Sequence, residues 1–113
     1  MAILSTHTLD SVSGNSAKNV RVQLFRLLGE FEKELVFDTR TNKEGRLSET
    51  FESGGALMEN YELVFHSGDY LVQKNIQEEN PVMDSVVIRL NVHDFERRYH
   101  IPLLIAPHNY TVW

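Results

Sequence analysis

The clearest pattern in this chain is a repeated alternation of apolar and polar residues, which is typical of half-buried β-strands. In one such run, Val20, Val22 and Leu24 alternate with the polar residues Arg21 and Gln23. Comparable short runs cover residues 20–24, 35–37, 61–65, 86–92 and 99–105. Each run is about as long as an ordinary strand, so the pattern predicts a chain built mostly of short strands.

Clusters of turn-forming residues separate these runs and support the same prediction. The clusters cover residues 13–15, 42–45, 53–55 and 67–69. Several short strands at this spacing predict an antiparallel β-sandwich. We also expect one short helix, with Asp69 as its cap and a turn from Tyr70 to Asn75. The helix should be short because Pro81 prevents its continuation.

Length and composition limit the classes of protein to which the chain can belong. Its 113 residues, 42% of them hydrophobic, predict a single domain over residues 1–113. The absence of cysteine excludes disulfides and thiolate metal sites. A net charge of -5 argues against a nucleic-acid partner, which would require a basic face. Without a signal peptide or a long apolar run, we expect a cytoplasmic protein with no membrane partner.

Histidine provides the candidate chemistry, although a single histidine is more often a surface or structural residue than a catalytic one. The five are His7, His66, His93, His100 and His108. Strand alternation places His100 opposite the apolar face that contains Ile101, and places His7 on the face of Ser5. Strands near opposite chain ends can be neighbours in a sandwich, so we expect that His7 and His100 could converge.

Metal and nucleophile sites are weaker interpretations of the same residues. His100 and His108 are separated by eight positions that include Pro102 and Pro107, and no zinc motif is present. We therefore predict no metal site. The serine nucleophile motif G-x-S-x-G is also absent, and the residues flanking His7 alternate faces along the strand.

Four segments resemble, in order and spacing, the transthyretin-related 5-hydroxyisourate hydrolases of urate catabolism. They read "ILSTHTLD" near the start, "TNKEGRL" at 41–47, "YELVFHSGDYL" at 61–71 and "RRYHIPLLIAP" at 97–107. The resemblance extends over essentially the whole chain. It implies an all-β sandwich of two four-stranded sheets with one short helix. It also implies a homotetramer, a dimer of dimers, whose active sites lie in a channel at the dimer–dimer interface.

The same resemblance implies a cyclic amide hydrolase that acts on a small heterocyclic substrate with His7, Arg46 and His100 as catalytic residues. This reaction requires an activated water and stabilisation of charge on the carbonyl oxygen. An imidazole can accept a proton from water, and the fork-shaped guanidinium can hold carbonyl oxygens. No metal or organic cofactor is implied.

The chain departs from the family at its end. The family has a Tyr-Arg-Gly-Ser tail that lines the site, whereas in this sequence Trp113 stands where that tyrosine would be and Arg-Gly-Ser does not follow. From this departure we predict His108, Tyr110 and Trp113 as substrate-binding residues, and an altered substrate is one consequence that the departure leaves open. The alternative interpretation is a frayed, exposed terminus. Trp113, for example, could stack on a planar ring.

A non-catalytic small-molecule carrier or interaction protein is the alternative function. The hormone-carrier branch of the family, transthyretin itself, also lacks the tail. That branch has lost the two histidines, however, whereas this chain retains His7 and His100. The retained histidines favour the hydrolase.

Overall fold

The structure is a computed structural model and describes residues 1–76 and 82–113. In chain order, the elements of the described residues are β1 (Ala2–Asp10), β2 (Arg21–Leu27), β3 (Lys33–Arg40), β4 (Arg46–Phe51), β5 (Glu59–Phe65), α1 (Ser67–Gln73), β6 (Val86–Val92), β7 (Arg98–His100), β8 (Leu103–Ile105) and β9 (Tyr110–Val112). No helix in these two ranges is long and apolar enough to cross a membrane.

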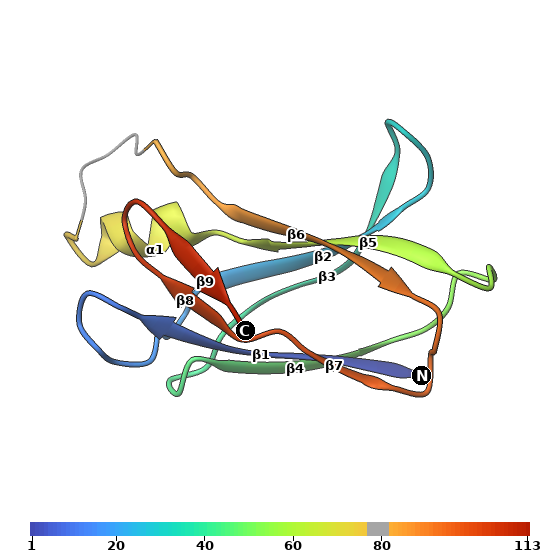
Figure 1. Cartoon of the computed structure of the whole chain (residues 1–113), viewed down its shortest axis with the longest axis horizontal. Coiled ribbons are helices and arrows are strands. Elements are labelled where there is room, and N and C mark those ends of the chain that lie inside the picture. The colour runs from blue at the N-terminus through green and yellow to red at the C-terminus, as the bar shows by residue number, and fades with distance from the viewer. Residues whose placement is uncertain (77–81) are drawn as a thin grey trace.

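The strands form two sheets that face each other, as Figure 1 shows. One sheet has the order β4-β1-β8-β9, with β7 also paired to β1, and the other has the order β3-β2-β5-β6. Strand β1 pairs in parallel with β7 and β8, whereas all the other pairs between named strands are antiparallel. The predicted sandwich with one short helix is confirmed.

The closing strand that the sequence predicts over residues 99–105 is divided into β7 and β8. Ile101 and Pro102 lie between the two halves, outside either strand. Proline has no N–H to donate to a neighbouring strand, which explains an interruption at this point. When β7 and β8 are counted as one strand, the two sheets have four strands each, as the family resemblance implies.

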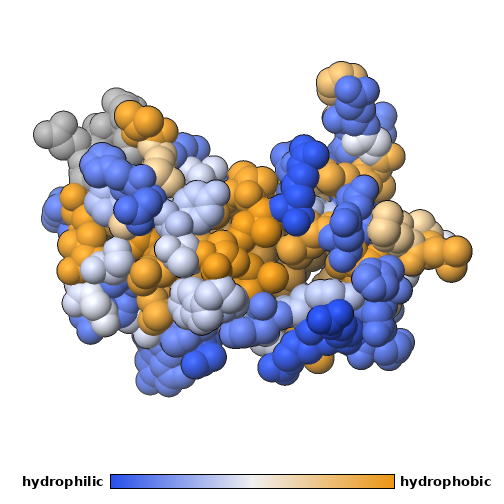
Figure 2. All heavy atoms as spheres, viewed as in Figure 1, coloured by the Kyte–Doolittle hydropathy of each residue, from blue (hydrophilic) through white to orange (hydrophobic). Residues whose placement is uncertain are grey.

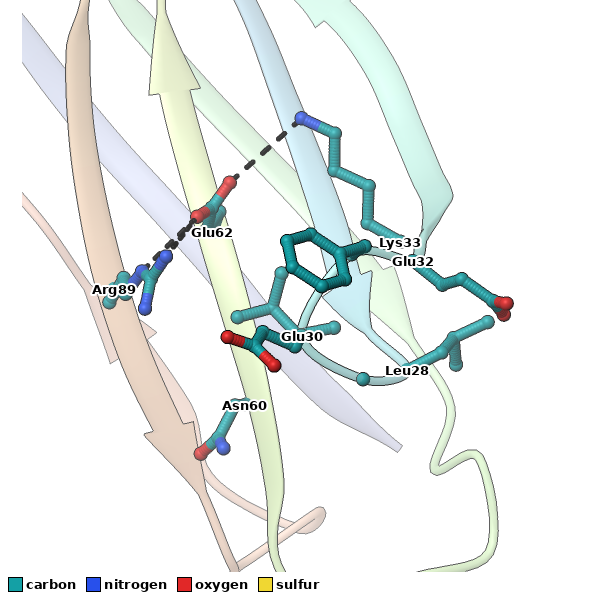
Figure 3. Close-up of a pocket in the computed structure, with 10 residues that line it drawn as sticks. Leu28, Glu30, Glu32, Lys33, Asn60, Glu62 and Arg89 are labelled. Carbon is teal, nitrogen blue, oxygen red and sulfur yellow. Dashed lines mark hydrogen bonds and ion pairs between the residues drawn. The ribbon is translucent and has the colours of Figure 1, made fainter.

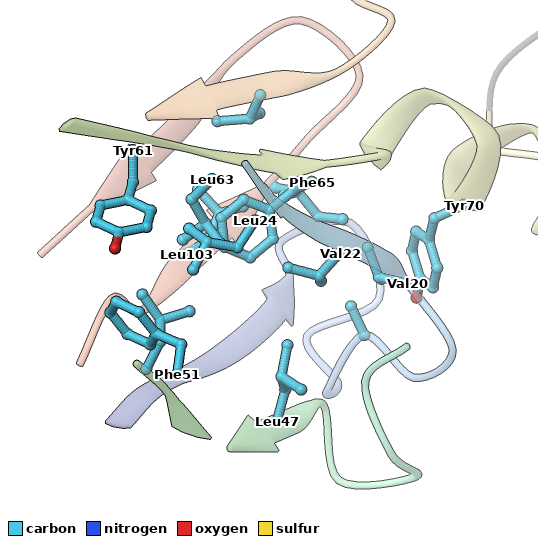
Figure 4. Packing of buried hydrophobic residues seen from close by; sticks show 14 of the residues in the cluster. Val20, Val22, Leu24, Leu47, Phe51, Tyr61, Leu63, Phe65, Tyr70 and Leu103 are labelled. Carbon is cyan, nitrogen blue, oxygen red and sulfur yellow. The ribbon is translucent and has the colours of Figure 1, made fainter. Parts of the chain in front are cut away.

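The core lies between the two sheets and consists of the inward-facing residues of their strands. Figure 4 shows part of this layer, with Leu24 and Leu63 from one sheet packed near Leu103 from the other. Phe51 contacts Tyr61 edge to face, with ring centroids 5.1 Å apart. Figure 2 shows the apolar residues gathered between the two layers. Burial of these side chains supplies the main driving force for folding.

Helix α1 begins earlier than the sequence predicts. The cluster 67–69, expected as a turn, forms the first turn of the helix; Asp69 lies inside that turn, and the N-cap is His66. Gly68 is required here by close packing, because a β-carbon on it would come within 2.6 Å of the carbonyl oxygen of Asp84. The predicted cap at Asp69 is therefore wrong, and the role of Pro81 lies outside the described residues.

A charged cluster at the start of β5 holds the loop between β4 and β5. The Tyr61 hydroxyl donates to the Glu59 carboxylate at 2.7 Å, and Glu59 also accepts from the N–H of Gly54 at 2.9 Å. Arg26 donates to the Tyr61 oxygen at 3.2 Å. Burial, followed by the hydrogen bond to Glu59, raises the pKa of the Tyr61 phenol to about 12.

Candidate active site

His7 and Arg46 face each other across the antiparallel pair β1 and β4. They are directly opposite in the register, so their side chains project from the same face of the sheet. That face is the outer one, because the alternate residues of β1, Thr6 and Thr8, are buried. The Arg46 side chain is exposed, and it has no hydrogen bond or ion pair with any residue in 1–76 or 82–113. The guanidinium is therefore available to a ligand.

His100 reaches the same face from the other side of β1. It pairs with Ser5 in the parallel register of β1 and β7, and the Ser5 hydroxyl lies 2.9 Å from its Nδ1 atom, within hydrogen-bonding distance. Ser5 and His7 are two residues apart on one strand, which corresponds to about 7 Å along it. Strand β1 therefore brings both histidines and Arg46 to one exposed surface. We call this surface, with Ser5, His7, Arg46 and His100, the histidine face.

The turn that precedes β4 fixes the backbone of Arg46. The Asn42 side-chain oxygen accepts hydrogen bonds from the N–H groups of Glu44 at 2.9 Å and Arg46 at 3.0 Å. Gly45 completes the turn with a positive φ of 73°, which glycine adopts without strain. The carbonyl oxygen of Gly45 accepts a hydrogen bond from the N–H of Thr8 at 2.8 Å. The predicted turn at 42–45 thus connects the residue before Arg46 to the residue after His7.

The structure distributes the predicted substrate-binding residues over different places. Tyr110 pairs with Ile105, whose side chain is buried in the core, so Tyr110 lies on the face of β9 opposite to that of His7. His108 lies in the exposed connection between β8 and β9, and Trp113 follows β9 with 62% of its side chain exposed. Tyr110 therefore does not join the histidine face of the sheet.

Thr111 and Ser48 are further polar residues of this face that the sequence analysis did not identify. Thr111 pairs with Leu104, which in turn pairs with Leu9, two residues beyond His7. Ser48 pairs with Ser5 from the β4 side. The signal for them was present in strand alternation, but it required the strand order, which the sequence does not provide.

The face contains no arrangement suited to a metal ion. Within residues 1–76 and 82–113, no group of three or more histidine, aspartate or glutamate side chains lies close enough together to bind one. His7, Arg46, Ser5 and His100 combine two imidazoles, a hydroxyl and a permanent cation. Such a set can transfer protons and stabilise a negatively charged oxygen.

A groove lies on the other sheet, between the β2–β3 hairpin and strands β5 and β6. It has a volume of about 640 Å³ and is lined by Leu27, Leu28, Gly29, Glu30, Phe31, Glu32, Lys33, Asn60, Glu62 and Arg89. Figure 3 shows Glu62 between Arg89, at 3.1 Å, and Lys33, at 4.0 Å. These cations already neutralise the one half-buried carboxylate of the groove, so the histidine face is the better candidate.

Comparison with known proteins identifies the family of the chain. The model of the HIUase/Transthyretin family matches residues 4–113. The chain belongs to this family. A 5-hydroxyisourate hydrolase of Pseudomonas aeruginosa is 35% identical over 115 residues, which cover 100% of this chain and 90% of the relative.

Two solved structures resemble the chain as a whole. A 5-hydroxyisourate hydrolase of Klebsiella pneumoniae superposes with a TM-score of 0.78 at 27% identity, covering 100% of this chain and 97% of that one. Sea bream transthyretin in complex with thyroxine gives a TM-score of 0.80 at 19% identity, covering 97% of this chain and 92% of that one, which shows the fold alone. The predicted family and the predicted hydrolase class are confirmed.

Proposed function

We propose that this chain hydrolyses 5-hydroxyisourate, or a close cyclic ureide, with His7, Arg46 and His100 as its catalytic residues. The observation that carries the proposal is the register of β1, in which Arg46 is opposite His7 and His100 is opposite Ser5. Three residues from distant parts of the sequence thereby lie on one solvent-facing surface. The hydrolases among the relatives support the choice of substrate.

The chemistry requires one water and no redox partner. A histidine accepts a proton from water as the water oxygen bonds to the ring carbonyl carbon, and the carbonyl oxygen becomes negatively charged. Arg46 stabilises that charge with its N–H donors. The C–N bond then breaks, and the ring nitrogen takes up the proton held by the histidine. The carboxylic acid that forms releases its remaining proton to solvent and becomes a carboxylate. General acid–base catalysis of this kind contributes about 10² to 10⁴ in rate.

The direct test generates 5-hydroxyisourate in situ and follows the decay of its ultraviolet absorbance with and without protein. We expect decay well above the spontaneous rate. Running the reaction in ¹⁸O-labelled water should place one labelled oxygen in the carboxylate of the product. Decay equal to the spontaneous rate would overturn the proposed substrate, and a panel of other cyclic ureides and imides would follow.

We further propose that the chain forms a homotetramer whose subunits enclose the histidine face. The half-buried apolar residues Leu9 and Leu104, which lie on that face beside His7, support an interface there. Sedimentation equilibrium of the full chain tests this assembly, and a monomer at micromolar concentration would contradict it. A cytoplasmic location also remains a proposal, for which fractionation of expressing cells is the test.

A further inference from the structure

We propose that Ser5 is the positioning residue of His100. Its hydroxyl keeps a hydrogen bond to Nδ1 of the imidazole throughout the reaction, whether or not that nitrogen carries a proton. Only the expected effect on kcat rests on the proposed function. The contact itself is a property of the fold. Ser5 would act through His100 and would not touch the substrate.

The Ser5 hydroxyl is placed to hold one particular nitrogen of the ring. Its oxygen lies 2.9 Å from Nδ1 of His100, and only 6% of the Ser5 side chain is exposed. The His100 side chain is itself exposed. A buried hydroxyl on Nδ1 leaves Nε2 as the nitrogen that faces solvent and a bound substrate.

The Ser5 side chain contacts the ring of His100, and the Ser5 main chain holds the residue that follows His100. The Ile101 N–H donates to the carbonyl oxygen of Ser5 at 2.8 Å, and the Thr6 hydroxyl donates to the carbonyl oxygen of Ile101 at 2.5 Å. These bonds fix the chain immediately after His100, where Pro102 ends the strand pairing. His100 is thus held by β1 through both its main chain and its ring.

Serine suits this position because a hydroxyl is both a donor and an acceptor. It can donate to Nδ1 when that nitrogen has a lone pair, and it can accept from Nδ1–H when the ring is the other tautomer or the imidazolium ion. A carboxylate in the same place would accept only, and it would favour the charged ring. Ser5 therefore allows His100 to gain and lose a proton without breaking the contact that orients it.

The structure also offers a matched control on the same row of the sheet. Ser48 lies directly opposite Ser5 on β4, on the same outer face, and its hydroxyl has no hydrogen bond with the described part of the chain. Replacement of Ser48 by alanine removes a hydroxyl from the same surface without touching His100. Comparison of the two variants thus isolates the contact between Ser5 and His100.

The experiment compares Ser5→Ala, Ser5→Thr and Ser48→Ala in the full chain, with circular dichroism to confirm folding. We expect Ser5→Ala to lower kcat on 5-hydroxyisourate by about 10-fold to 100-fold with KM changed less than about threefold, as for a misplaced catalytic group. Ser5→Thr, which keeps the hydroxyl, should recover most of kcat. Ser48→Ala keeps the contact between Ser5 and His100 and should lower kcat less than Ser5→Ala does.

A second readout does not depend on activity. The ¹⁵N resonances of the His100 ring report its tautomer, and they should move in Ser5→Ala and remain in place in Ser48→Ala. Unchanged His100 resonances in Ser5→Ala would overturn the positioning role, even if the wild type is active. A wild type without activity would overturn the proposed function instead, while the resonances would still decide the role of Ser5.

Discussion

His7 lies directly opposite Arg46 on the neighbouring antiparallel strand, so an imidazole and a permanent cation lie side by side on the outer face of the sheet. This arrangement has a simple origin in the sequence. Gly45 and the Asn42 side chain fix the turn that starts β4 at Arg46. The hydrogen bond from the Thr8 N–H to the Gly45 carbonyl oxygen ties this turn to β1, and it fixes the register that places Arg46 across from His7.

Arg46→Lys should lower kcat/KM for 5-hydroxyisourate by about 10-fold to 100-fold, because lysine is a point charge and cannot give two parallel N–H donors to one oxyanion or carbonyl pair. Steady-state kinetics measures the loss. Arg89→Lys is the control, since Arg89 pairs with Glu62 on the other sheet and should leave the rate unchanged. Equal rates for wild type and Arg46→Lys would remove the guanidinium from the proposed mechanism.

Gly45→Ala should destabilise the fold far more than Gly14→Ala. Both glycines have a positive φ, 73° and 78°, so both substitutions impose a similar backbone strain of about 1 kcal/mol. At Gly45 the added β-carbon would also overlap the carbonyl oxygen of Thr8, whereas at Gly14 it meets nothing within 4 Å. We expect an additional loss of about 2 kcal/mol or more in urea unfolding. Equal losses would mean that the turn yields without cost.

Thr8→Val should raise the free energy of unfolding by about 1 kcal/mol. The hydroxyl of Thr8 is fully buried, and among the buried side-chain polar groups of the described ranges it alone lacks a hydrogen-bond partner, so its desolvation is uncompensated. Thr6→Val is the matched comparison. Thr6 is equally buried but donates to Ile101, so its replacement should cost about 1 kcal/mol. A loss of stability in Thr8→Val would contradict the prediction.

The sequence anticipated the architecture better than it anticipated the contacts of the site. Alternation at Val20, Val22 and Leu24 predicts strand β2 because a half-buried strand leaves a period of two in the sequence. It also places His7 and Ser5 on one face. The parallel pairing of β1 with β7 brings together residues about 95 positions apart, and no local pattern encodes such a pairing.

Two further elements show why local signals mislead. The 67–69 cluster has the composition of a turn, but Gly68 is there because Asp84 packs against it, so tertiary contact decides the conformation. Strand β4, with the sequence RLSETF, has only two buried residues, Leu47 and Phe51, and it gives too weak an alternation to be predicted. Its position beside β1 nevertheless supplies Arg46.

Tyr61 should make the fold less stable at alkaline pH. In the folded chain its pKa is raised to about 12, and in the unfolded chain it is near 10, so the unfolded state releases a proton first. The contribution of the Tyr61 phenol to the free energy of unfolding is therefore fully present below pH 10. It is lost as the pH rises toward 12, by up to about 1.4 kcal/mol per pH unit. Tyr61→Phe should reduce the dependence of the unfolding free energy on pH between 10 and 12, measured by urea unfolding. Replacement of Tyr110, which is half-exposed, by phenylalanine should reduce it less.

The most direct test of the account compares kcat/KM for 5-hydroxyisourate between His7→Ala and His93→Ala. His7 lies on the face with Arg46 and His100, whereas His93 is an exposed residue that follows β6 of the other sheet. We predict a loss of at least about 100-fold for His7→Ala, the scale of general acid–base catalysis, and no change for His93→Ala. Equal rates for the two variants would contradict the claim that this face of the sheet is the active site.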